Sequence, residues 1–566
     1  MNSIIPSNGL EALQSADIYV TKIGGENAGR LDLNATNARE RIRSGIKQVT
    51  AVSAIRSSDS QFSAFADASV VDRDTDGRVK SGFNTTSHLI EIARVLSAKK
   101  AGGGTENAVA IANRISEFTK AIALREAGND AHLDDKEDVA DELVALIEKY
   151  ITDEHHPNSL VSWIQADKHC SVMQRGADWI LHTRNEYVSL TGLGENLAKH
   201  IYEAYFKRRG IAVEHIGIDR AFYGVYPKMH RLENPEETIQ GFQDLAADRI
   251  RTILQTNDVA IEGGYVPILG SERGYSDKTG ALLARATKSE HERTLYLIEK
   301  EYPIMSADPR KVPEARTVRR MTHFLARELF GNSRGARGSA VHPEALEMLA
   351  SDDINIVVMN PEQEPTADNT TLIQDFEPQP NGVEIIASKA VPFALQISSS
   401  NIIGNLSFES DMAHWFASNG LQIQHTATSE GTVSYTFFEG ECSERVLNEL
   451  RSHLEKEYGI SDKNTLSKLE DLSVIYCLGN NMRQHGQASR AAEALDLAEV
   501  DIHFISQGLN ESVMTFLVDA KDSEKAVQML HKIFISIDEA EYRRIKDEFR
   551  SSMLQAIQSI SFPTSL

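Results

Sequence analysis

The sequence predicts an α/β protein in two parts. Short apolar runs, which include DIYVTKI, QVTAVSA, VAIEGGYVPI and TLYLIE, alternate with segments of helical periodicity from Asp17 to about Ile373. Such alternation predicts a domain with a largely parallel sheet. Beyond the acidic segment Asp375 to Gly382, two blocks of about 70 residues each repeat a strand, a loop, a helix, two strands and a helix. This repeat predicts a pair of small ferredoxin-like modules.

The same patterns divide the chain into domains. We expect a first domain over residues 1–375, with a helical insertion at about 100–165, then modules over 383–460 and 468–535 and a C-terminal helix over 536–566. The insertion and the last helix each place apolar residues on one helical face. These residues are Val139, Leu143, Leu146, Ile147 and Tyr150 in the insertion, and Tyr542, Ile545, Phe549 and Met553 in the last helix.

Composition and charge exclude several classes of function. Of 566 residues, 59 are basic and 82 are acidic, which leaves a formal net charge of −23 at pH 7. Binding to a nucleic-acid backbone or an anionic membrane surface requires positive charge, so we expect neither partner. The three cysteines, Cys170, Cys442 and Cys477, lie far apart, as suits a reducing cytosol. No stretch reaches the roughly 18 apolar residues of a membrane span, and residues 1–17 lack the blocks of a signal peptide, so we expect a soluble cytoplasmic protein.

Lys22, Gly24 and Gly25 form the first candidate anion site. Lys22 follows the predicted strand DIYVT, and the two glycines lack side chains. Backbone N–H groups can therefore approach an anion closely while the lysine supplies positive charge. The segment is not a Walker A loop, because it lacks the Gly-Lys-Ser/Thr ending. A tight turn between a strand and a helix is the alternative explanation.

A second candidate segment, Arg273 to Thr279, leads into the apolar helix ALLARA. Ser276 and Asp277 are favourable N-cap residues, and the start of a helix offers N–H groups to phosphate oxygens. Arg273 can bind a carboxylate through two hydrogen bonds. A capped surface helix with a solvated arginine is the alternative.

Three further segments have ordinary structural explanations when each is taken alone. Glu195 stands near the start of a predicted helix, where a carboxylate interacts favourably with the helix dipole. The segment Asp308-Pro309-Arg310 is typical of a turn. His342-Pro343 suits the first turn of a helix.

Taken together, the order and spacing of these segments resemble those of the aspartokinases. That family joins an amino-acid-kinase fold, in which helices sandwich a largely parallel sheet, to two C-terminal ACT modules. Its signatures are Lys-Phe-Gly-Gly-Thr-Ser, Val-Ser-Ala, Gly-Glu, Gly-Arg-Gly-Gly-Ser-Asp, Asp-Pro-Arg and His-Pro. The counterparts here are KIGG at Lys22, VSA at Val52, GE at Gly194, RGYSD at Arg273, SADPR at Ser306 and HP at His342. The resemblance extends from about Tyr19 to Phe534, and it is greatest to the divergent subgroup associated with ectoine biosynthesis.

The resemblance implies a cytoplasmic kinase of amino-acid biosynthesis that uses ATP with Mg²⁺ to convert L-aspartate to 4-phospho-L-aspartate. It implies that ATP or its phosphates are bound by Lys22, Gly24, Gly25, Ser53, Ser276, Asp277, Asp308 and Arg310, with Lys22 and Asp277 catalytic. The amino acid would be bound by Glu195, Arg273 and Ser57. Because the reaction brings anions together, positioning and positive charge must carry the catalysis. The ACT modules imply a homodimer and allosteric regulation by a small molecule, and no residue is assigned as a metal ligand.

Three departures from the family sequence leave other functions open. Glu26-Asn27 replaces Thr-Ser after the two glycines, the loop after Ala54 lacks the family's glycine, and Glu299-Lys300 stands in place of Thr-Asp. The carboxylate of Glu26 would repel a triphosphate unless it turns away or contacts a metal ion. A kinase for another amino acid or small carboxylate, and a regulatory paralogue without activity, are therefore the alternatives.

Overall fold

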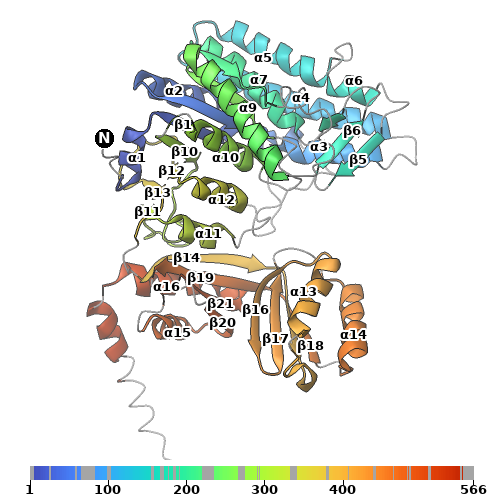
Figure 1. Ribbon diagram of the computed structural model, residues 1–566, viewed down its shortest axis with the longest axis vertical. Helices are drawn as coiled ribbons and strands as arrows, with labels where there is room; N and C mark the ends of the chain where they lie inside the picture. Colours follow the sequence, from blue (N-terminus) through green and yellow to red (C-terminus); the bar gives the residue numbers. More distant parts are fainter. Residues whose placement is uncertain are drawn as a thin grey trace, which may run out of the picture. The chain divides into compact units, whose positions relative to one another are not determined.

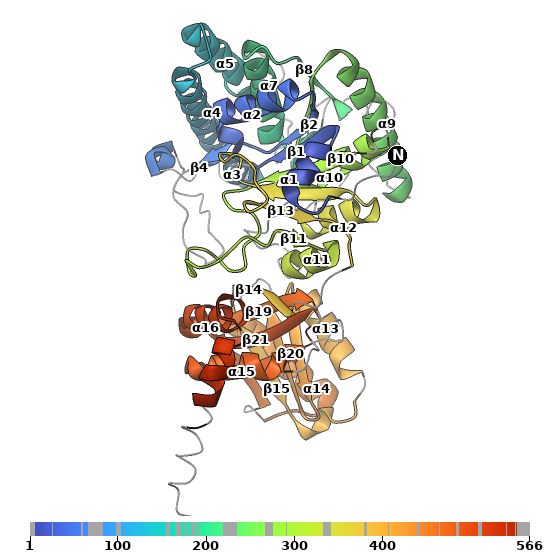
Figure 2. The same ribbon diagram turned by 90° about the vertical axis from the view of Figure 1, so that its left-hand side faces the viewer.

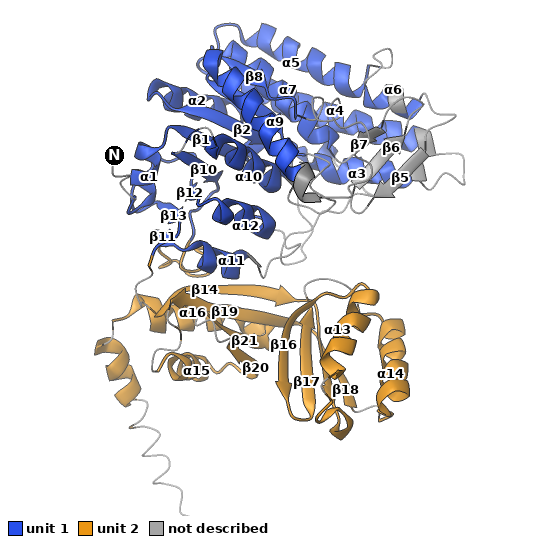
Figure 3. Cartoon of the chain, in the orientation of Figure 1, with its two compact units in different colours: residues 1–304, 319–376 blue, residues 305–318, 377–566 orange. Residues whose placement is uncertain are grey.

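Two compact units make up the chain (Figure 3). The computed structural model describes residues 6–24, 27–57, 60–65, 83–97, 104–153, 159–165, 171–175, 178–182, 187–189, 192–218, 235–265, 275–289, 291, 293–331, 341–377, 382–405, 407–437, 442–462, 465–480, 482, 486–507, 512–538, 540–548 and 551. Unit 1 comprises residues 1–304 and 319–376, and unit 2 comprises residues 305–318 and 377–566.

The segment 305–318 differs from the predicted domain boundaries. The sequence places it in the first domain, whereas in the structure it belongs to unit 2. Its residues Ala307 and Val312 are buried in a hydrophobic core of that unit. A short segment of turn-forming residues has no periodicity, so its sequence does not indicate which core it joins.

An eight-stranded sheet is the centre of unit 1 (Figure 1), with the order β11-β13-β12-β10-β1-β2-β9-β8. Its strands are β1 (Ile18–Ile23), β2 (Lys47–Val52), β8 (Val213–His215), β9 (Val259–Gly263), β10 (Thr294–Glu299), β11 (Arg320–Met321), β12 (Asn355–Met359) and β13 (Thr370–Ile373). All neighbouring pairs are parallel except β12 with β13. The predicted largely parallel sheet is therefore confirmed. β9 and β10 are buried throughout, which explains their apolar sequences.

Helices cover both sides of this sheet, as Figure 2 shows. One group contains α2 (Leu31–Arg43), α3 (Thr85–Ser97), α4 (Gly104–Asn129), α5 (Lys136–Ile151), α6 (Leu160–Gln165) and α7 (Leu193–Arg208). The other contains α9 (Pro235–Thr256), α10 (Tyr275–Lys288) and α12 (Pro343–Ser351), and α11 (His323–Gly331) packs on α12. α1 (Gly9–Ser15) packs against β12 and β13. Helices α4 to α6 occupy the predicted insertion, and α5 buries Val139, Leu143 and Ile147 on one face.

Two small antiparallel sheets complete the described part of unit 1. β3 (Arg56–Ser57) pairs with β4 (Phe83–Asn84), and β6 (Asp178–His182) lies between β5 (Ser171–Arg175) and β7 (Tyr187–Ser189). None of the described helices of the chain is long and apolar enough to cross a membrane.

Unit 2 contains two four-stranded antiparallel sheets. The first sheet has the order β16 (Ile423–Ser429), β17 (Thr432–Phe437), β15 (Ala394–Ser398) and β18 (Leu466–Leu469), and it shares a core with α13 (Phe408–Ser418) and α14 (Glu444–Tyr458). The second has the order β14 (Gly382–Val391), β19 (Leu472–Asn480), β21 (Val513–Asp519) and β20 (Ile502–Gln507), with α15 (Gln487–Leu497) and α16 (Ser523–His531). Residues 540–548 are helical, and Tyr542 is buried in the second core.

The first strand of unit 2 also differs from the predicted boundaries. The sequence places residues 383–460 in the first module, but β14 pairs with β19 of the second sheet. β18, in turn, pairs with β15 of the first sheet. The first module is therefore inserted between β14 and the rest of the second. The alternation of a strand shows which side chains share a face, not which strand will lie beside it.

Candidate active site

The candidate site lies at the carboxyl ends of β1, β2, β9 and β10. These strands run parallel, so their carboxyl ends meet at one edge of the sheet. Lys22 lies near the end of β1, Ser53 follows β2 and Lys300 follows β10. Ser276 and Asp277 come from the first turn of α10. The carboxyl edge of a parallel sheet is the usual position of a ligand site in α/β proteins.

A buried ion pair joins β1 to α10 in this site. Lys22 Nζ lies 2.8 Å from Asp277 Oδ1, and the two side chains are 13% and 14% exposed. Asp277 Oδ2 accepts a hydrogen bond of 3.0 Å from the N–H of His342, the residue that caps α12. Burial raises the pKa of Asp277, but the positive charges of Lys22 and Lys300 outweigh it and hold the pKa below its usual value. At neutral pH Asp277 is therefore an ionised carboxylate that lies near two cationic groups.

Two serines and a glycine bring β2, β9 and α10 together. Ser53 Oγ donates a hydrogen bond of 2.7 Å to Ser276 Oγ. Gly264, just after β9, donates from its N–H to the carbonyl oxygen of Val52 at 2.8 Å. A Cβ atom at Gly264 would lie 2.6 Å from Ser276 Cβ and 2.9 Å from the Val52 oxygen. A side chain at Gly264 would therefore separate the segments that carry the two serines.

Glu195 lies in the first turn of α7, close enough to Lys22 for the charge of that lysine to act on its carboxyl group. A Cβ at the preceding Gly194 would lie 2.7 Å from Ala54 Cβ, so a glycine is needed where α7 approaches the loop after β2. Burial raises the pKa of Glu195 to about 7, against the opposing effects of backbone N–H groups and Lys22. Its Oε2 atom is buried and has no hydrogen-bond partner in the structure. An unpaired buried carboxylate oxygen fits a ligand that brings a positive charge or an N–H donor.

The departure at Glu299-Lys300 has a structural explanation. Glu299 Oε1 lies 2.7 Å from Arg41 Nη2, and the Glu299 side chain is 1% exposed. Arg41 also donates to Gln48 Oε1 at 3.0 Å, so Glu299 takes part in polar contacts that join β10, α2 and β2. Lys300 instead contributes positive charge at Asp277. Sequence reasoning did not assign Lys300 to the site, although a lysine directly after a buried strand is the same signal that identified Lys22.

The structure brings together five of the residues predicted from the sequence. Contacts or charge effects connect Lys22, Ser53, Glu195, Ser276 and Asp277 through the neighbouring strands and helices. Gly24 is two residues after Lys22, and a Cβ atom at Gly24 would lie 3.7 Å from Lys22 Nζ, so this glycine is close to the lysine ammonium group.

The other predicted residues either lie outside the described residues or belong to other described segments. Gly25 and Arg273, like Glu26, lie outside the described residues. Ser57 is on β3, opposite Phe83 of β4. Asp308 and Arg310 lie in unit 2 and form an ion pair of 2.9 Å with each other. The roles of Ser57, Asp308 and Arg310 at the ligands stay predictions.

Both units are similar to known protein families. The model of the amino acid kinase family matches residues 69–360, and a model of the ACT domain matches residues 475–534. The aspartate kinase Ask_Ect of Stutzerimonas stutzeri is 24% identical over 266 residues, which are 47% of this chain and 52% of that protein. The aspartokinase of Saccharomyces cerevisiae is 27% identical over 300 residues, with coverages of 48% and 54%. The chain thus spans about half the length of these two relatives. The aspartate kinase FUB3 of Gibberella moniliformis is 23% identical over 493 residues, or 80% of this chain and 88% of that one.

Solved structures show the same fold. The structure of E. coli aspartokinase III in complex with aspartate and ADP has a TM-score of 0.59 at 18% identity and covers 91% of this chain and 99% of its own. Clostridium acetobutylicum aspartate kinase has a TM-score of 0.57 at 15% identity, with coverages of 92% and 100%. The predicted fold class and the resemblance to aspartokinases are both confirmed.

Proposed function

This chain belongs to the amino acid kinase family, and we propose that it is an aspartate kinase. It would transfer the γ-phosphoryl group of ATP to the side-chain carboxylate of L-aspartate and form 4-phospho-L-aspartate. The observation that carries the proposal is the set of charges at the carboxyl edge of the sheet, where Lys22 and Lys300 lie near Asp277 and Glu195 has an unpaired oxygen. The aspartokinase names of the relatives described above support the same substrate.

The residues of the site divide naturally between the two substrates. Lys22 carries three N–H donors, so it can contact a phosphate oxygen while it stays paired with Asp277. The ionised Glu195 would bind the ammonium group of aspartate with its unpaired Oε2. In the reaction a carboxylate oxygen of aspartate forms a bond to the γ-phosphorus as the bond to the bridging oxygen of ADP breaks. Positive charge on Lys22 would oppose the repulsion between these anions.

The donor groups of the site also fit a magnesium nucleotide. Asp277 provides a carboxylate, which is a hard oxygen donor of the kind that Mg²⁺ prefers, so this residue would hold the ion. A bound Mg²⁺ would neutralise phosphate charge.

A cytoplasmic location is consistent with Cys442 and Cys477, which are buried and free.

The activity is tested by measuring ADP release over a panel of amino acids and small carboxylates, with hydroxylamine added to trap an acyl phosphate. Of the compounds in this panel, we expect only L-aspartate to give ADP release and hydroxamate formation. Activity with a different carboxylate would show the alternative substrate class. No ADP release with any of them, combined with no binding of ATP, would show a regulatory paralogue.

The raised pKa of Glu195 predicts a pH-dependent Michaelis constant. With a pKa of about 7, Glu195 is mostly ionised at about pH 8 and mostly protonated at about pH 6, and only the ionised form attracts the ammonium group. We expect the KM for aspartate to rise about tenfold as the pH falls from about 8 to about 6, while the KM for ATP changes little. Steady-state kinetics of the wild type and of Glu195→Gln measure this. The variant should have a raised KM for aspartate that no longer depends on pH, and a wild-type KM without pH dependence would remove Glu195 from aspartate binding.

We also propose that the chain forms a homodimer through unit 2. Strand β20 stands at the end of its sheet, and its Ile505 is 55% exposed. A second copy of the chain can cover the exposed apolar side chain on this strand. We expect Ile505→Lys to shift a dimer towards monomer in light scattering, whereas Ile403→Lys, which changes an isoleucine of unit 2 that is 54% exposed, leaves it unchanged. A monomeric wild type, or equal effects of the two substitutions, would contradict this interface.

Regulation through unit 2 is part of the same proposal. The ACT-domain match in this unit supports it, as does the structure of E. coli aspartokinase III in complex with lysine and aspartate. A regulator would change the kinase activity only by binding two conformations with different affinity. Lysine, threonine, methionine and the end products of the pathway are the effectors to be screened against activity.

A further inference from the structure

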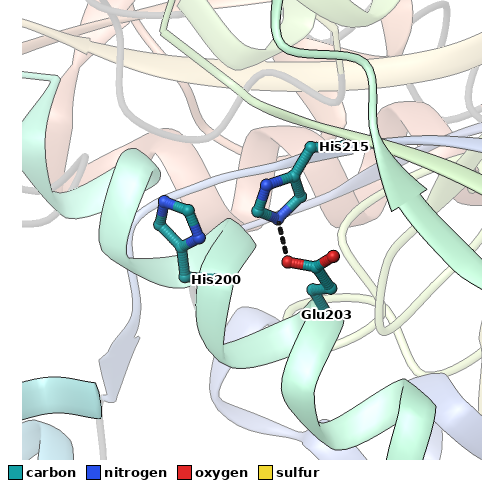
Figure 4. Close-up of side chains that lie close together, drawn as sticks. All are labelled: His200, Glu203 and His215. Carbon is teal, nitrogen blue, oxygen red and sulfur yellow. Dashed lines mark ion pairs between the residues drawn. The ribbon is translucent and has the colours of Figure 1, made fainter.

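Three side chains with metal-binding chemistry face one another between α7 and β8 (Figure 4). His200 and Glu203 are three residues apart on α7 and therefore share a face of the helix. His215 ends β8, the edge strand of the large sheet, and its ring lies 4.5 Å from that of His200 between centroids. One ligand atom from each residue lies within 4.8 Å of the other two. A small closure of these side chains would bring all three atoms onto one ion.

Neighbouring groups orient two of these side chains from outside the cluster. The hydroxyl group of Tyr150 lies 3.1 Å from His200 Nε2, and the Tyr150 ring stacks on the imidazole with 4.7 Å between centroids. Lys207 Nζ donates to Glu203 Oε1 at 2.7 Å, while Glu203 Oε2 lies 2.9 Å from His215 Nε2. Metal-binding histidines and carboxylates commonly have such partners, which hold the ring and the carboxylate in position.

An ion pair between His215 and Glu203 is the simpler explanation of part of this geometry. It does not explain His200, which brings a ligand atom within 4.8 Å of the other two residues while Tyr150 contacts its Nε2 atom. Unit 2 offers a comparison, because His503 Nε2 and Asp519 Oδ1 form a similar pair of 2.8 Å. That pair belongs to no group of three possible ligands in the described part of the chain. The third converging side chain is what distinguishes the cluster in unit 1.

We propose that His200, Glu203 and His215 bind one divalent transition-metal ion of the zinc class. Two imidazoles and one carboxylate suit Zn²⁺, Co²⁺ or Ni²⁺, whereas Mg²⁺ and Ca²⁺ prefer oxygen ligands. His200 would bind through Nδ1, because its Nε2 contacts Tyr150, and water would complete the coordination. None of the three residues belongs to the machinery proposed for phosphoryl transfer.

Such an ion would join α7 to the edge of the sheet. α7 also carries Lys199, whose Nζ forms a buried ion pair of 3.0 Å with Glu262 of β9. The ion would strengthen the existing contact between this helix and β8, which is one strand further out than β9. Because it would bind the folded chain and not the separated ligands, it should raise the unfolding temperature by an amount that grows with the ratio of free ion to its dissociation constant.

The test uses the full chain without an affinity tag, stripped of metal with EDTA and then freed of EDTA. We expect one Zn²⁺ ion per chain to bind at this site and to raise the unfolding temperature. Competition with a chromophoric chelator measures the binding. Co²⁺ should give the visible absorption bands of a cobalt ion with four or five nitrogen and oxygen ligands. Affinity should fall as the pH falls, because protons compete with the ion for its ligand atoms. Millimolar Mg²⁺ should not reproduce the stabilisation.

Variants locate the ion. His200→Gln and His215→Gln should each weaken Zn²⁺ binding at least about tenfold, because even the loss of a residue that hydrogen-bonds to a metal ligand typically costs that much. Both variants should also lose the rise in unfolding temperature on addition of Zn²⁺. His503→Gln, the matched change in a histidine–carboxylate pair, should leave both unchanged. His200→Gln keeps the His215–Glu203 pair, so it tests the site even if the other variants fold poorly. Absence of Zn²⁺ binding, equal stabilisation by Mg²⁺, or unchanged Zn²⁺ affinity in His200→Gln would overturn the proposal.

Discussion

Replacing Lys22 by methionine is expected to lower the turnover number at least about a hundredfold, because one preorganised charge at a phosphoryl transition state contributes about 3 kcal/mol. Lys22 has a fixed position for this role, since its Nζ atom lies 2.8 Å from a carboxylate and its side chain is only 13% exposed. Steady-state release of ADP at saturating substrates measures the effect, and circular dichroism checks the fold. Lys120→Met is the matched control, because Lys120 is a lysine of unit 1 that also forms ion pairs and is 18% exposed. Turnover of Lys22→Met within about threefold of the wild type would remove Lys22 from the mechanism.

The partner of Lys22 separates a loss of stability from a loss of chemistry. Lys22→Met leaves Asp277 in a buried position with less compensating charge, so this variant should be less stable than the wild type. Asp277→Asn removes that charge and keeps an oxygen that can accept from the His342 N–H. The double variant should therefore recover part of the stability lost in Lys22→Met, but it should recover none of the activity. Recovery of activity in the double variant would show that Lys22 serves only to neutralise Asp277.

This ion pair also shows how far the site could be predicted. The turn after β1 and the start of α10 each had a sequence pattern, and the spacing of the segments connected both to one family. The contact between them depends on the order of strands in the sheet, which no local pattern contains. For the same reason the pairing of Glu299 with Arg41, 258 positions away, was not predictable. Glu299 differs from the family sequence, yet it serves a contact inside the fold.

The fold itself was predictable where burial dictates the sequence. Strands β1, β2, β9 and β10 are almost entirely buried, so their apolar runs stand out. The difficult elements were those whose partner is distant. β14 shows an ordinary strand pattern, but it pairs across the whole first module with β19. Segment 305–318 is short and depends on the core of unit 2 for its position.

The second large effect concerns stability. Arg209→Met is expected to lower the free energy of unfolding by about 3–5 kcal/mol, because it breaks a buried network by removing one partner. Arg209 Nη1 lies 2.5 Å from Asp130 Oδ2 and 2.5 Å from Asp32 Oδ1, and the Arg209 and Asp130 side chains are 1% and 0% exposed. Tyr205 also donates its hydroxyl hydrogen to Asp130. The network joins the ends of α4 and α7 to the start of α2.

The neighbouring residue and the pH dependence make this prediction specific. Arg208→Met removes an arginine that is 43% exposed and pairs with the 42% exposed Glu142, so it should lower the free energy of unfolding by no more than about 1 kcal/mol.

Burial raises the pKa of Asp130, but hydrogen bonds from Tyr205, the His132 N–H and Arg209 outweigh it and lower the pKa below 3.8. In the wild type the ionised Asp130 therefore stabilises the fold above about pH 4, and this contribution is lost as the pH falls through the lowered pKa. In Arg209→Met the carboxylate lacks its cation, so protonation relieves the variant while it weakens the wild type. Urea unfolding should show a difference in the free energy of unfolding between the wild type and Arg209→Met that is full at about pH 7. This difference should shrink as the pH falls, first through the pKa of Asp130 in the variant and then through its lowered pKa in the wild type. A constant difference over this range would show that Arg209 acts through packing and not through the charge of Asp130.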